Sequence, residues 1–250
     1  STFSSSRSTK LVHGGVRYLE QGNISLVFDA LKERGILQKN APHLVKNLSL
    51  IVPNFGSFDK FYYGVGLKIY DGLAGKYSFG KSQILSKDET ITLLPTIDTE
   101  NLKGGILYHD GQFDDTRLLI NLVQTAVKND AVCLNYARVF KLTKDTENKV
   151  NGVSFIDEES GQLFTTKAKV VINATGAFCD KIRQFSDAKA EKIIKPSQGI
   201  HLVFDKSFLP SETGILIPKT VDGRVLFAIP WHEHTLIGTT DTPIENAELE

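Results

Sequence analysis

The early part of the chain carries apolar residues at helical spacing. Within residues 23–34, apolar side chains fall on one helical face and charged side chains on the other: Ile24, Val27, Phe28 and Leu31 against Asp29, Lys32 and Glu33. This segregation predicts a helix that packs one face on a core. Asn23, immediately before it, is a residue type that caps helix starts, so we expect the helix to begin there.

Residues 58–75 form a second helical pattern that is unusually aromatic. Its large residues recur at near-helical spacing and are flanked by two lysines: Phe58, Phe61, Tyr62, Val65, Ile69 and Tyr70, with Lys60 and Lys68. A core-facing helix gives this pattern. A helix lying on a membrane interface gives it too, because aromatic rings and lysine stems suit the boundary between lipid and water. The pattern leaves both interpretations open.

A third helix is predicted after the acidic pair Asp114 and Asp115. The apolar residues that follow repeat at helical spacing, which predicts that they form the core face of this helix: Leu119, Leu122, Val123 and Ala126. Paired carboxylates can act as acid and base. Carboxylates at a helix start also cap its free amides and offset the helix dipole. We favour capping as the role of this pair.

Strand-like runs dominate the second half of the chain. Apolar density predicts strands within residues 48–52, 131–139, 150–156, 163–166, 195–204 and 224–241, the last as two strands around a polar turn. His201 lies within the run at 195–204. Residues 157–161 predict a hairpin turn. The continuous apolar run at 169–176 is typical of a central parallel strand buried on both faces. It ends in the small residues Ala174, Thr175 and Gly176, beside which we expect a ligand, as in open α/β sheets.

Composition narrows the class of partner. The 250 residues are 41% hydrophobic, which suits a globular protein with one large core or two modest ones. Acidic and basic residues number 29 each and the sequence pI is about 7.0, so no overall field attracts nucleic acid, and none is expected as a partner. Cys133 and Cys179 lack metal-binding spacing, and we predict no metal site. No apolar run approaches the roughly 18 residues of a membrane-spanning helix.

Residues 4–20 are rich in hydrogen-bond donors and poor in core residues. A run of hydroxyl residues is followed by Lys10, by Gly14 and Gly15, and by Arg17. Glycine lets a ligand approach the backbone closely. Arginine grips a phosphate or carboxylate with a rigid fork of donors. The segment therefore predicts a site for an anion; the alternative is a poorly ordered tail that runs into a helix.

Several motifs together resemble the FAD-dependent glycerol-3-phosphate dehydrogenases. They are Ser-Ser-Arg-Ser-Thr-Lys-Leu-Val-His-Gly-Gly-Val-Arg-Tyr-Leu at 5–19, Tyr-Gly-Val-Gly-Leu-Lys-Ile-Tyr-Asp at 63–71, Tyr-His-Asp-Gly-Gln-Phe-Asp-Asp-Thr-Arg at 108–117, Ser-Gln-Gly-Ile-His at 197–201, and Pro-Trp followed by Ile-Gly-Thr-Thr-Asp within 230–241. The matching segments run from residue 5 to residue 242, so the resemblance covers nearly the whole chain.

The resemblance implies a mixed α/β (α+β) fold. It consists of an incomplete Rossmann-like FAD-binding domain of the glycine oxidase and D-amino-acid oxidase superfamily, with an antiparallel-sheet substrate or cap domain. Residues 1–45 and 105–185 would form parts of the FAD-binding domain, and residues 46–104 and 186–250 the substrate or cap domain. No Gly-x-Gly-x-x-Gly motif opens the sequence. We therefore expect an internal fragment, inactive alone, that lacks the Gly-rich FAD loop and the C-terminal part.

The resemblance also implies roles for individual residues. His201 would act as the base or would orient the substrate, a role that suits an imidazole whose usual pKa lies near neutrality. Arg17 and Tyr18 would bind the substrate. Three segments would contact FAD: Ser5, Arg7, Ser8, Thr9, Lys10, Leu11, His13, Gly14 and Gly15; then Val139; and finally Ala174, Thr175 and Gly176.

The implied activity is oxidation of sn-glycerol 3-phosphate to dihydroxyacetone phosphate. The hydride would pass to flavin N5, and the electrons then to quinone or another acceptor such as oxygen. The implied location is the cytoplasm, with peripheral contact to the cytoplasmic face of the inner membrane. Two other functions stay open: a related flavin oxidase that acts on amines or amino acids, and a non-catalytic binding module.

Overall fold

The computed structural model describes residues 4–220 and 222–247; for residues 17, 20 and 57–62 it describes the backbone alone. The chain divides into two compact units. The first comprises Ser1–Asn121 and Gly199–Thr240, and the second Leu122–Gln198 and Asp241–Glu250. The predicted FAD and substrate domains divide the chain by role in binding rather than by internal contacts, so their boundaries stay a prediction.

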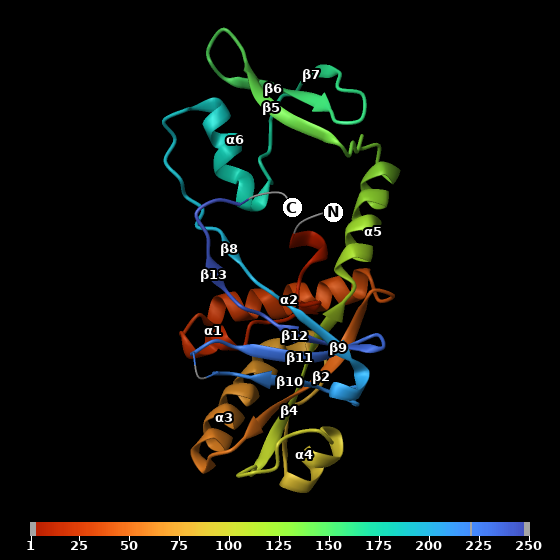
Figure 1. The fold of residues 1–250 in the computed structure, drawn as a ribbon, viewed down its shortest axis with the longest axis vertical. Coiled ribbons are helices and arrows are strands. Elements are labelled where there is room, and N and C mark those ends of the chain that lie inside the picture. The colour runs from red at the N-terminus through yellow and green to blue at the C-terminus, as the bar shows by residue number, and fades with distance from the viewer. Residues whose placement is uncertain (1–3, 221, 248–250) are drawn as a thin grey trace. The chain divides into compact units, whose positions relative to one another are not determined.

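A mixed sheet forms the centre of the first unit. Its strands are β1 (Leu11–Val12), β2 (Val45–Asn54), β3 (Gln83–Leu85), β4 (Gly104–Phe113), β9 (Leu202–Asp205), β10 (Gly214–Ile217), β11 (Leu226–Trp231) and β12 (His234–Gly238). In the described residues these eight strands run in the order β1-β4-β2-β10-β11-β12-β9, with β3 paired to β4 (Figure 1). The pair β2–β10 is parallel and the others are antiparallel. The antiparallel pair β11–β12 confirms the two strands predicted around the polar turn.

Helices flank this sheet. They are α1 (Arg17–Glu20), α2 (Ile24–Asn40), α3 (Ser57–Ala74), α4 (Lys87–Leu93) and the first part of α5 (Asp115–Lys128), with the short 3-10 helices η1 (Ser4–Ser6), η2 (Gly75–Tyr77) and η4 (Lys206–Phe208). Three of them, α2, α3 and α5, confirm the predicted helices. The first of these begins directly after Asn23, although the Asn23 side chain makes no capping hydrogen bond.

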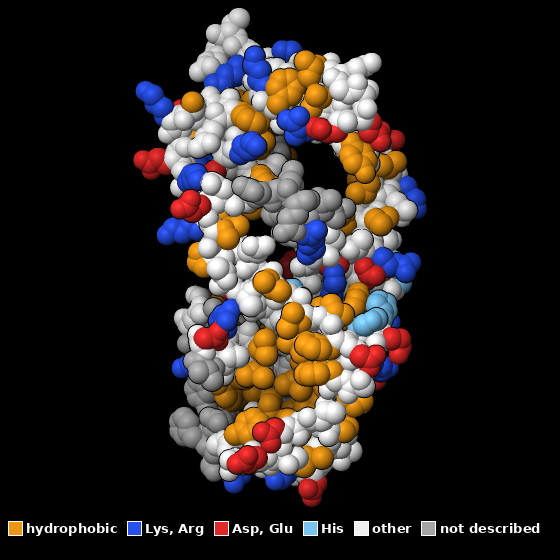
Figure 2. All heavy atoms as spheres, in the orientation of Figure 1, with side chains coloured by type: hydrophobic (Ala, Val, Ile, Leu, Met, Phe, Trp, Pro, Cys, Tyr) orange, Lys and Arg blue, Asp and Glu red, His pale blue; other side chains and the backbone are white. Residues whose placement is uncertain are grey.

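The main core lies between the sheet and helices α2 and α3. Alternate residues of the strands face these helices, because side chains along a strand point to opposite faces in turn. The buried cluster comprises Val27, Leu31, Leu48, Leu50, Val52, Leu67, Tyr70, Ala74, Ile106, Tyr108, Leu216, Ile229 and Leu236. A smaller cluster of Ile51, Leu85, Leu94 and Leu209 includes the residue after α4. Figure 2 shows further apolar side chains gathered over the lower half of the face in view.

The core-facing stripe of α2 differs from the predicted one. Val27 and Leu31 are fully buried as expected, whereas Ile24 and Phe28 are exposed. The stripe continues instead to Arg34, which is only 1% exposed. Spacings of four and three residues put positions 27, 31 and 34 on one helical face. The helix therefore buries a charge where the apolar pattern predicted none.

Helix α3 has two apolar sides. Leu67, Tyr70 and Ala74 are buried in the core, which confirms the core-facing interpretation for this side of the helix. Val65 and Ile69, one turn apart, are exposed. The side chains of Phe58, Phe61 and Tyr62 lie outside the described residues. No helix in the described part of the chain is long and apolar enough to cross a membrane.

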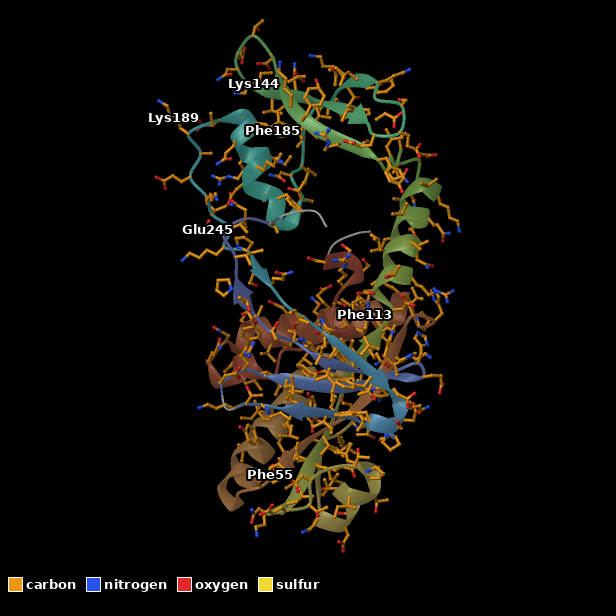
Figure 3. All side chains as sticks on the ribbon, in the orientation of Figure 1. Phe55, Phe113, Lys144, Phe185, Lys189 and Glu245 are labelled. Atoms are coloured by element: carbon orange, nitrogen blue, oxygen red, sulfur yellow. The ribbon has the colours of Figure 1, made fainter. Side chains whose placement is uncertain are left out.

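The second unit contains a three-stranded antiparallel sheet, β5 (Ala137–Lys144), β6 (Val150–Asp157) and β7 (Leu163–Lys167), which confirms the predicted hairpin. Its other elements are the end of α5, the 3-10 helix η3 (Gly176–Phe178), α6 (Cys179–Ser186), and the short pair β8 (Ser197–Gln198) and β13 (Thr242–Pro243). Helix α6 packs on β5, where Lys144 Nζ donates to the Ser186 carbonyl at 2.8 Å (Figure 3).

Two predicted strands of this unit are wrong. Residues 131–136 and 169–176 form no strand, and both segments expose apolar side chains, with Val132 86% and Ile172 83% exposed. Strand structure requires hydrogen bonds to a neighbouring strand. The described residues provide no such neighbour for either run, so an apolar sequence alone does not produce a strand.

The predicted core face of α5 is also wrong, because Leu122 and Val123 are exposed. The capping prediction holds for both carboxylates of the acidic pair. Asp115 Oδ1 accepts a hydrogen bond from the Thr116 amide at 2.7 Å. Asp114 Oδ1 accepts a hydrogen bond from the Arg117 amide at 2.9 Å, which satisfies one of the free amides at the helix start. Asp115 has other partners, described below.

Gly14 packs in this core, and we expect Gly14→Ala to destabilise the protein. A Cβ at this position would lie 2.5 Å from Tyr70 Oη and 2.6 Å from Leu31 Cγ. Overpacking of this kind costs about 1–3 kcal/mol. Gly72→Ala is the matched control, because its Cβ would meet nothing within 4 Å in the exposed part of α3, where alanine stabilises a helix. Thermal unfolding should show a lower Tm for the first variant alone, and equal Tm values would contradict the packing argument.

Candidate active site

A mostly apolar cavity of about 600 Å3 lies in the first unit. Its walls come from the N-terminal segment, from α3 and from strands β2, β4, β10 and β11. Apolar and aromatic residues such as Leu19, Tyr63, Leu67 and Phe227 form most of its surface, and the polar side chains include Thr9, His13 and Thr239. A few polar groups in an apolar wall are typical of a small-molecule site. We call it the apolar cavity.

Four of the predicted site residues line the apolar cavity: Thr9, His13, Gly15 and Tyr18. The His13 ring stacks on Phe227 with ring centres 6.3 Å apart and an angle of 23° between the planes. Gly15 has a φ of +70°, a left-handed conformation that glycine adopts without strain. The segment thus presents a flat ring and an unobstructed backbone to the cavity.

Gly14 does not line the apolar cavity and instead contacts a buried polar network, one member of which, Asp110, also lines the cavity. The Gly14 amide donates to Tyr70 Oη at 2.8 Å and to Asp110 Oδ1 at 3.3 Å. The Tyr70 hydroxyl donates to Asp110 Oδ2 at 2.9 Å. Arg34 Nη1 forms an ion pair with Asp110 Oδ1 at 2.5 Å. Packing and this network explain glycine at position 14, whereas the sequence had suggested approach of a ligand.

The network holds its tyrosines in the protonated form. Burial, with the Asp110 charge adding to it, raises the pKa of Tyr70 well above its usual value. Burial likewise raises the pKa of Tyr108, which lines the apolar cavity. Both phenols therefore remain hydrogen-bond donors at neutral pH.

Sequence reasoning missed the charged members of this network, although a signal was present. Arg34 continues the spacing of Val27 and Leu31 along α2. Asp110 continues the alternation of Ile106 and Tyr108 along β4. Opposite charges at core-facing positions of two elements indicate a buried ion pair.

A second set of contacts fixes the loop before β1. Asp115 accepts hydrogen bonds from the Ser8 hydroxyl at 2.8 Å and from the Ser8 amide at 3.1 Å, and it pairs with Lys10 Nζ at 2.7 Å. Burial alone would raise the pKa of Asp115, but hydrogen bonds from Lys10 and Ser8 outweigh it and hold that pKa below its usual value. Asp115 is therefore ionised at neutral pH.

Thr9 lies between these two residues and meets the predicted base. Its Oγ1 shares a hydrogen bond of 2.8 Å with His201 Nε2. His201 precedes β9 rather than lying within a strand, as the sequence had suggested, and it is half-buried. Burial, followed by the positive charge of Lys10, lowers the pKa of His201 below its usual value. The imidazole is thus neutral at neutral pH and can accept a proton.

The other predicted residues lie elsewhere. Leu11 pairs with Gln112 in the sheet and packs against the main core. Ser5 and Arg7 precede the loop and are not among the residues that line the apolar cavity. The side chain of Arg17 lies outside the described residues.

The remaining predicted FAD contacts belong to the second unit: Val139 in β5, and Ala174, Thr175 and Gly176 at the start of η3. Gly176 has a φ of +55°, and a Cβ added there would meet nothing within 4 Å, so its backbone is open to a ligand. That these residues share one site with the N-terminal segment stays a prediction.

A second cavity of about 640 Å3 in the first unit is lined by charged residues of both signs, among them Lys46, Asp114, Arg117 and Glu233. Phe113, labelled in Figure 3 at the end of β4, also lines it. None of the predicted site residues does so. The apolar cavity is therefore the better candidate for the active site.

Comparisons with known proteins show which family the chain resembles. The chain is 42% identical to the mitochondrial glycerol-3-phosphate dehydrogenase of Schizosaccharomyces pombe, over 97% of this chain and 40% of that protein. The structure of the glycerol-3-phosphate dehydrogenase from Bacillus halodurans complexed with FAD superposes with a TM-score of 0.76 at 34% identity, over 98% of this chain and 41% of that one. The chain thus spans about 40% of the length of these relatives.

The fold class is confirmed more widely. Glycine oxidase from Geobacillus kaustophilus gives a TM-score of 0.67 at 19% identity, over 96% of this chain and 61% of that one, a likeness of fold alone. The family profile described as FAD dependent oxidoreductase matches residues 3–249. These matches confirm the resemblance on which the predictions rest. The chain belongs to the family of FAD-dependent oxidoreductases.

Proposed function

We propose that the protein oxidises sn-glycerol 3-phosphate to dihydroxyacetone phosphate with FAD as its cofactor. The observation that carries the proposal is the Thr9–His201 pair beside the apolar cavity, in a chain 42% identical to a glycerol-3-phosphate dehydrogenase. The Thr9 hydroxyl holds one ring nitrogen of a neutral imidazole, which leaves the other ring nitrogen to accept the hydroxyl proton.

The residues present fit the ring of FAD. The stacked rings of His13 and Phe227 offer a flat aromatic wall, and Gly15 leaves the backbone open beside it. In this proposal they hold the ring, while Ser5, Arg7, Ser8, Lys10, Leu11 and Gly14 support the same segment. Val139, Ala174, Thr175 and Gly176 hold other parts of the cofactor. When bound, FAD accepts the hydride from C2 of the substrate.

His201 takes the proton of the substrate's C2 hydroxyl at Nδ1. Its other ring nitrogen, Nε2, is engaged by the Thr9 hydroxyl, which fixes the ring. Tyr18, exposed at the rim of the apolar cavity, contacts the substrate, and Arg17 beside it binds the phosphate. Loss of the hydride to FAD and of the proton to His201 converts the alcohol to the ketone.

The proposal extends to the electron acceptor and the location. The electrons pass to quinone or to oxygen, and the protein is cytoplasmic with peripheral contact to the cytoplasmic face of the inner membrane. Supporting this contact, Val65 and Ile69 of α3 and Ile24 of α2 are exposed and also line the apolar cavity. An apolar rim of this kind suits a lipid surface.

The substrate is tested on the full-length protein. We expect the visible spectrum of oxidised flavin, bleaching of that spectrum by glycerol 3-phosphate without air, and reduction of a dye by the same substrate. Glycine and D-amino acids serve as controls. Bleaching by an amine and not by glycerol 3-phosphate would favour the amine oxidase alternative, and absence of any flavin spectrum would favour a binding module.

The role of His201 predicts a pH dependence. Because burial and Lys10 lower the pKa of His201, the acid limb of kcat/KM should lie below about pH 6.5. Lys10→Met removes a positive charge that disfavours protonation, so the limb should move to higher pH. His201→Ala should lower kcat by about 100-fold or more. His43→Ala, outside the apolar cavity, is the control. A limb that Lys10→Met leaves unmoved, or moves to lower pH, would refute the assignment.

Membrane contact is tested by sedimentation with vesicles of mixed anionic and zwitterionic phospholipid. We expect the double variant Val65→Ser with Ile69→Ser to reduce the fraction of protein bound to vesicles several-fold. Each change removes roughly 1–2 kcal/mol of favourable transfer free energy from water to lipid. Val127→Ser, an equally exposed change on α5, should bind like the unchanged protein. Equal binding by all three proteins would mean that α3 makes no contact with lipid.

A further inference from the structure

One buried carboxylate outside the apolar cavity controls the loop that carries Thr9. Asp115 is 5% exposed and contacts the residues on both sides of Thr9. On one side it accepts two hydrogen bonds from Ser8, and on the other it pairs with Lys10 Nζ at 2.7 Å. The residues on either side of Thr9 are therefore both bound by a single charged group.

The loop conformation needs such support. Lys10 has a φ of +62°, a left-handed conformation that is unfavourable for a residue with a side chain. Its amide donates to Ser8 Oγ at 3.1 Å, and its Nζ donates to the Ser6 carbonyl at 3.0 Å. All of these contacts close the loop around Thr9, and the contacts with Asp115 join it to the rest of the unit.

We propose that Asp115 is a positioning residue that holds the Ser8–Lys10 loop so that the Thr9 hydroxyl fixes the imidazole of His201 at the apolar cavity. Asp115 acts through Thr9. This inference rests on the proposed function, in which His201 accepts the substrate proton. It assigns to the second carboxylate of the acidic pair a role in addition to the helix capping that the sequence indicated.

Asp114 provides a matched control. It carries the same charge at the same helix start and caps the Arg117 amide at 2.9 Å. The Asp114 carboxylate binds an amide of its own helix, whereas the Asp115 carboxylate binds both Ser8 and Lys10 of the loop. Asp114→Asn and Asp115→Asn therefore differ in the loop contact and share the loss of one charge at the helix start.

The loop itself is tested by limited trypsin digestion of the full-length protein, because trypsin cleaves after Arg7 and Lys10. Cleavage requires local opening of the chain. We expect Asp115→Asn to speed cleavage at these sites, identified by mass, by about tenfold or more, since it weakens charge-assisted hydrogen bonds. Asp114→Asn should be cut at the unchanged rate. This measurement does not depend on the substrate.

Kinetics test whether Asp115 acts through Thr9. We expect Asp115→Asn to lower kcat by about 10- to 100-fold with a smaller change in KM, because misplacement of reacting groups affects the chemical step. Thr9→Val should show a similar loss. The double variant should lose no more than Thr9→Val alone, because a residue that acts through another adds nothing once its partner is removed. If Asp115 had a purely structural role, the fold-losses in kcat of the two single variants would multiply in the double variant.

Two results would overturn the proposal: equal trypsin sensitivity of Asp114→Asn and Asp115→Asn, or multiplied losses in the double variant. If Asp115→Asn does not accumulate, Ser8→Ala is used in its place, because it removes the hydrogen bond from the Ser8 hydroxyl to Asp115. The same results are then expected in the trypsin digestion and in the kinetics. If the unchanged protein does not oxidise glycerol 3-phosphate, the proposed function fails. The trypsin comparison would still decide whether Asp115 holds the loop.

Discussion

The buried ion pair between Arg34 and Asp110 is the interaction on which the first unit depends. Both charges lie in the core, where an unpaired ion would be prohibitively costly. The pair is acceptable because Tyr70 and the Gly14 amide share the carboxylate. These four residues come from α2, β4, α3 and the N-terminal segment. Satisfying one buried charge therefore joins the three elements and makes the N-terminal segment part of the core.

This anchorage determines what the segment can do. The Gly14 amide is bound by Tyr70, and the residues on either side of it, His13 and Gly15, line the apolar cavity. A few residues earlier a second carboxylate, Asp115, holds Ser8 and Lys10, and Thr9 between them meets His201. A base is effective only if it stays within hydrogen-bond reach of the proton that it removes. Two carboxylates on opposite ends of the segment provide that fixed geometry.

Local patterns predicted the elements whose hydrogen bonds are internal or between chain neighbours. The helices α2, α3 and α5 and the hairpin β6–β7 are of this kind. The runs at 131–136 and 169–176 failed because a strand requires a partner that the run itself does not specify. The predictions of buried faces on α2 and α5 were wrong for a related reason. Periodicity shows which residues share a helical face, but it does not show what that face contacts.

From the sequence alone, the motifs determined the family and indicated the candidate site residues, because the residues of each motif are close together in the chain. Only the tertiary structure decided their roles. Ser8 and Asp115 are 107 positions apart and Thr9 and His201 are 192 apart, so no local pattern shows that they touch. The glycine at 14, expected to admit a ligand, packs on a tyrosine and a leucine. A carboxylate expected to cap a helix also holds a distant loop. Contacts between distant residues depend on how the elements pack, and packing is a property of the whole fold.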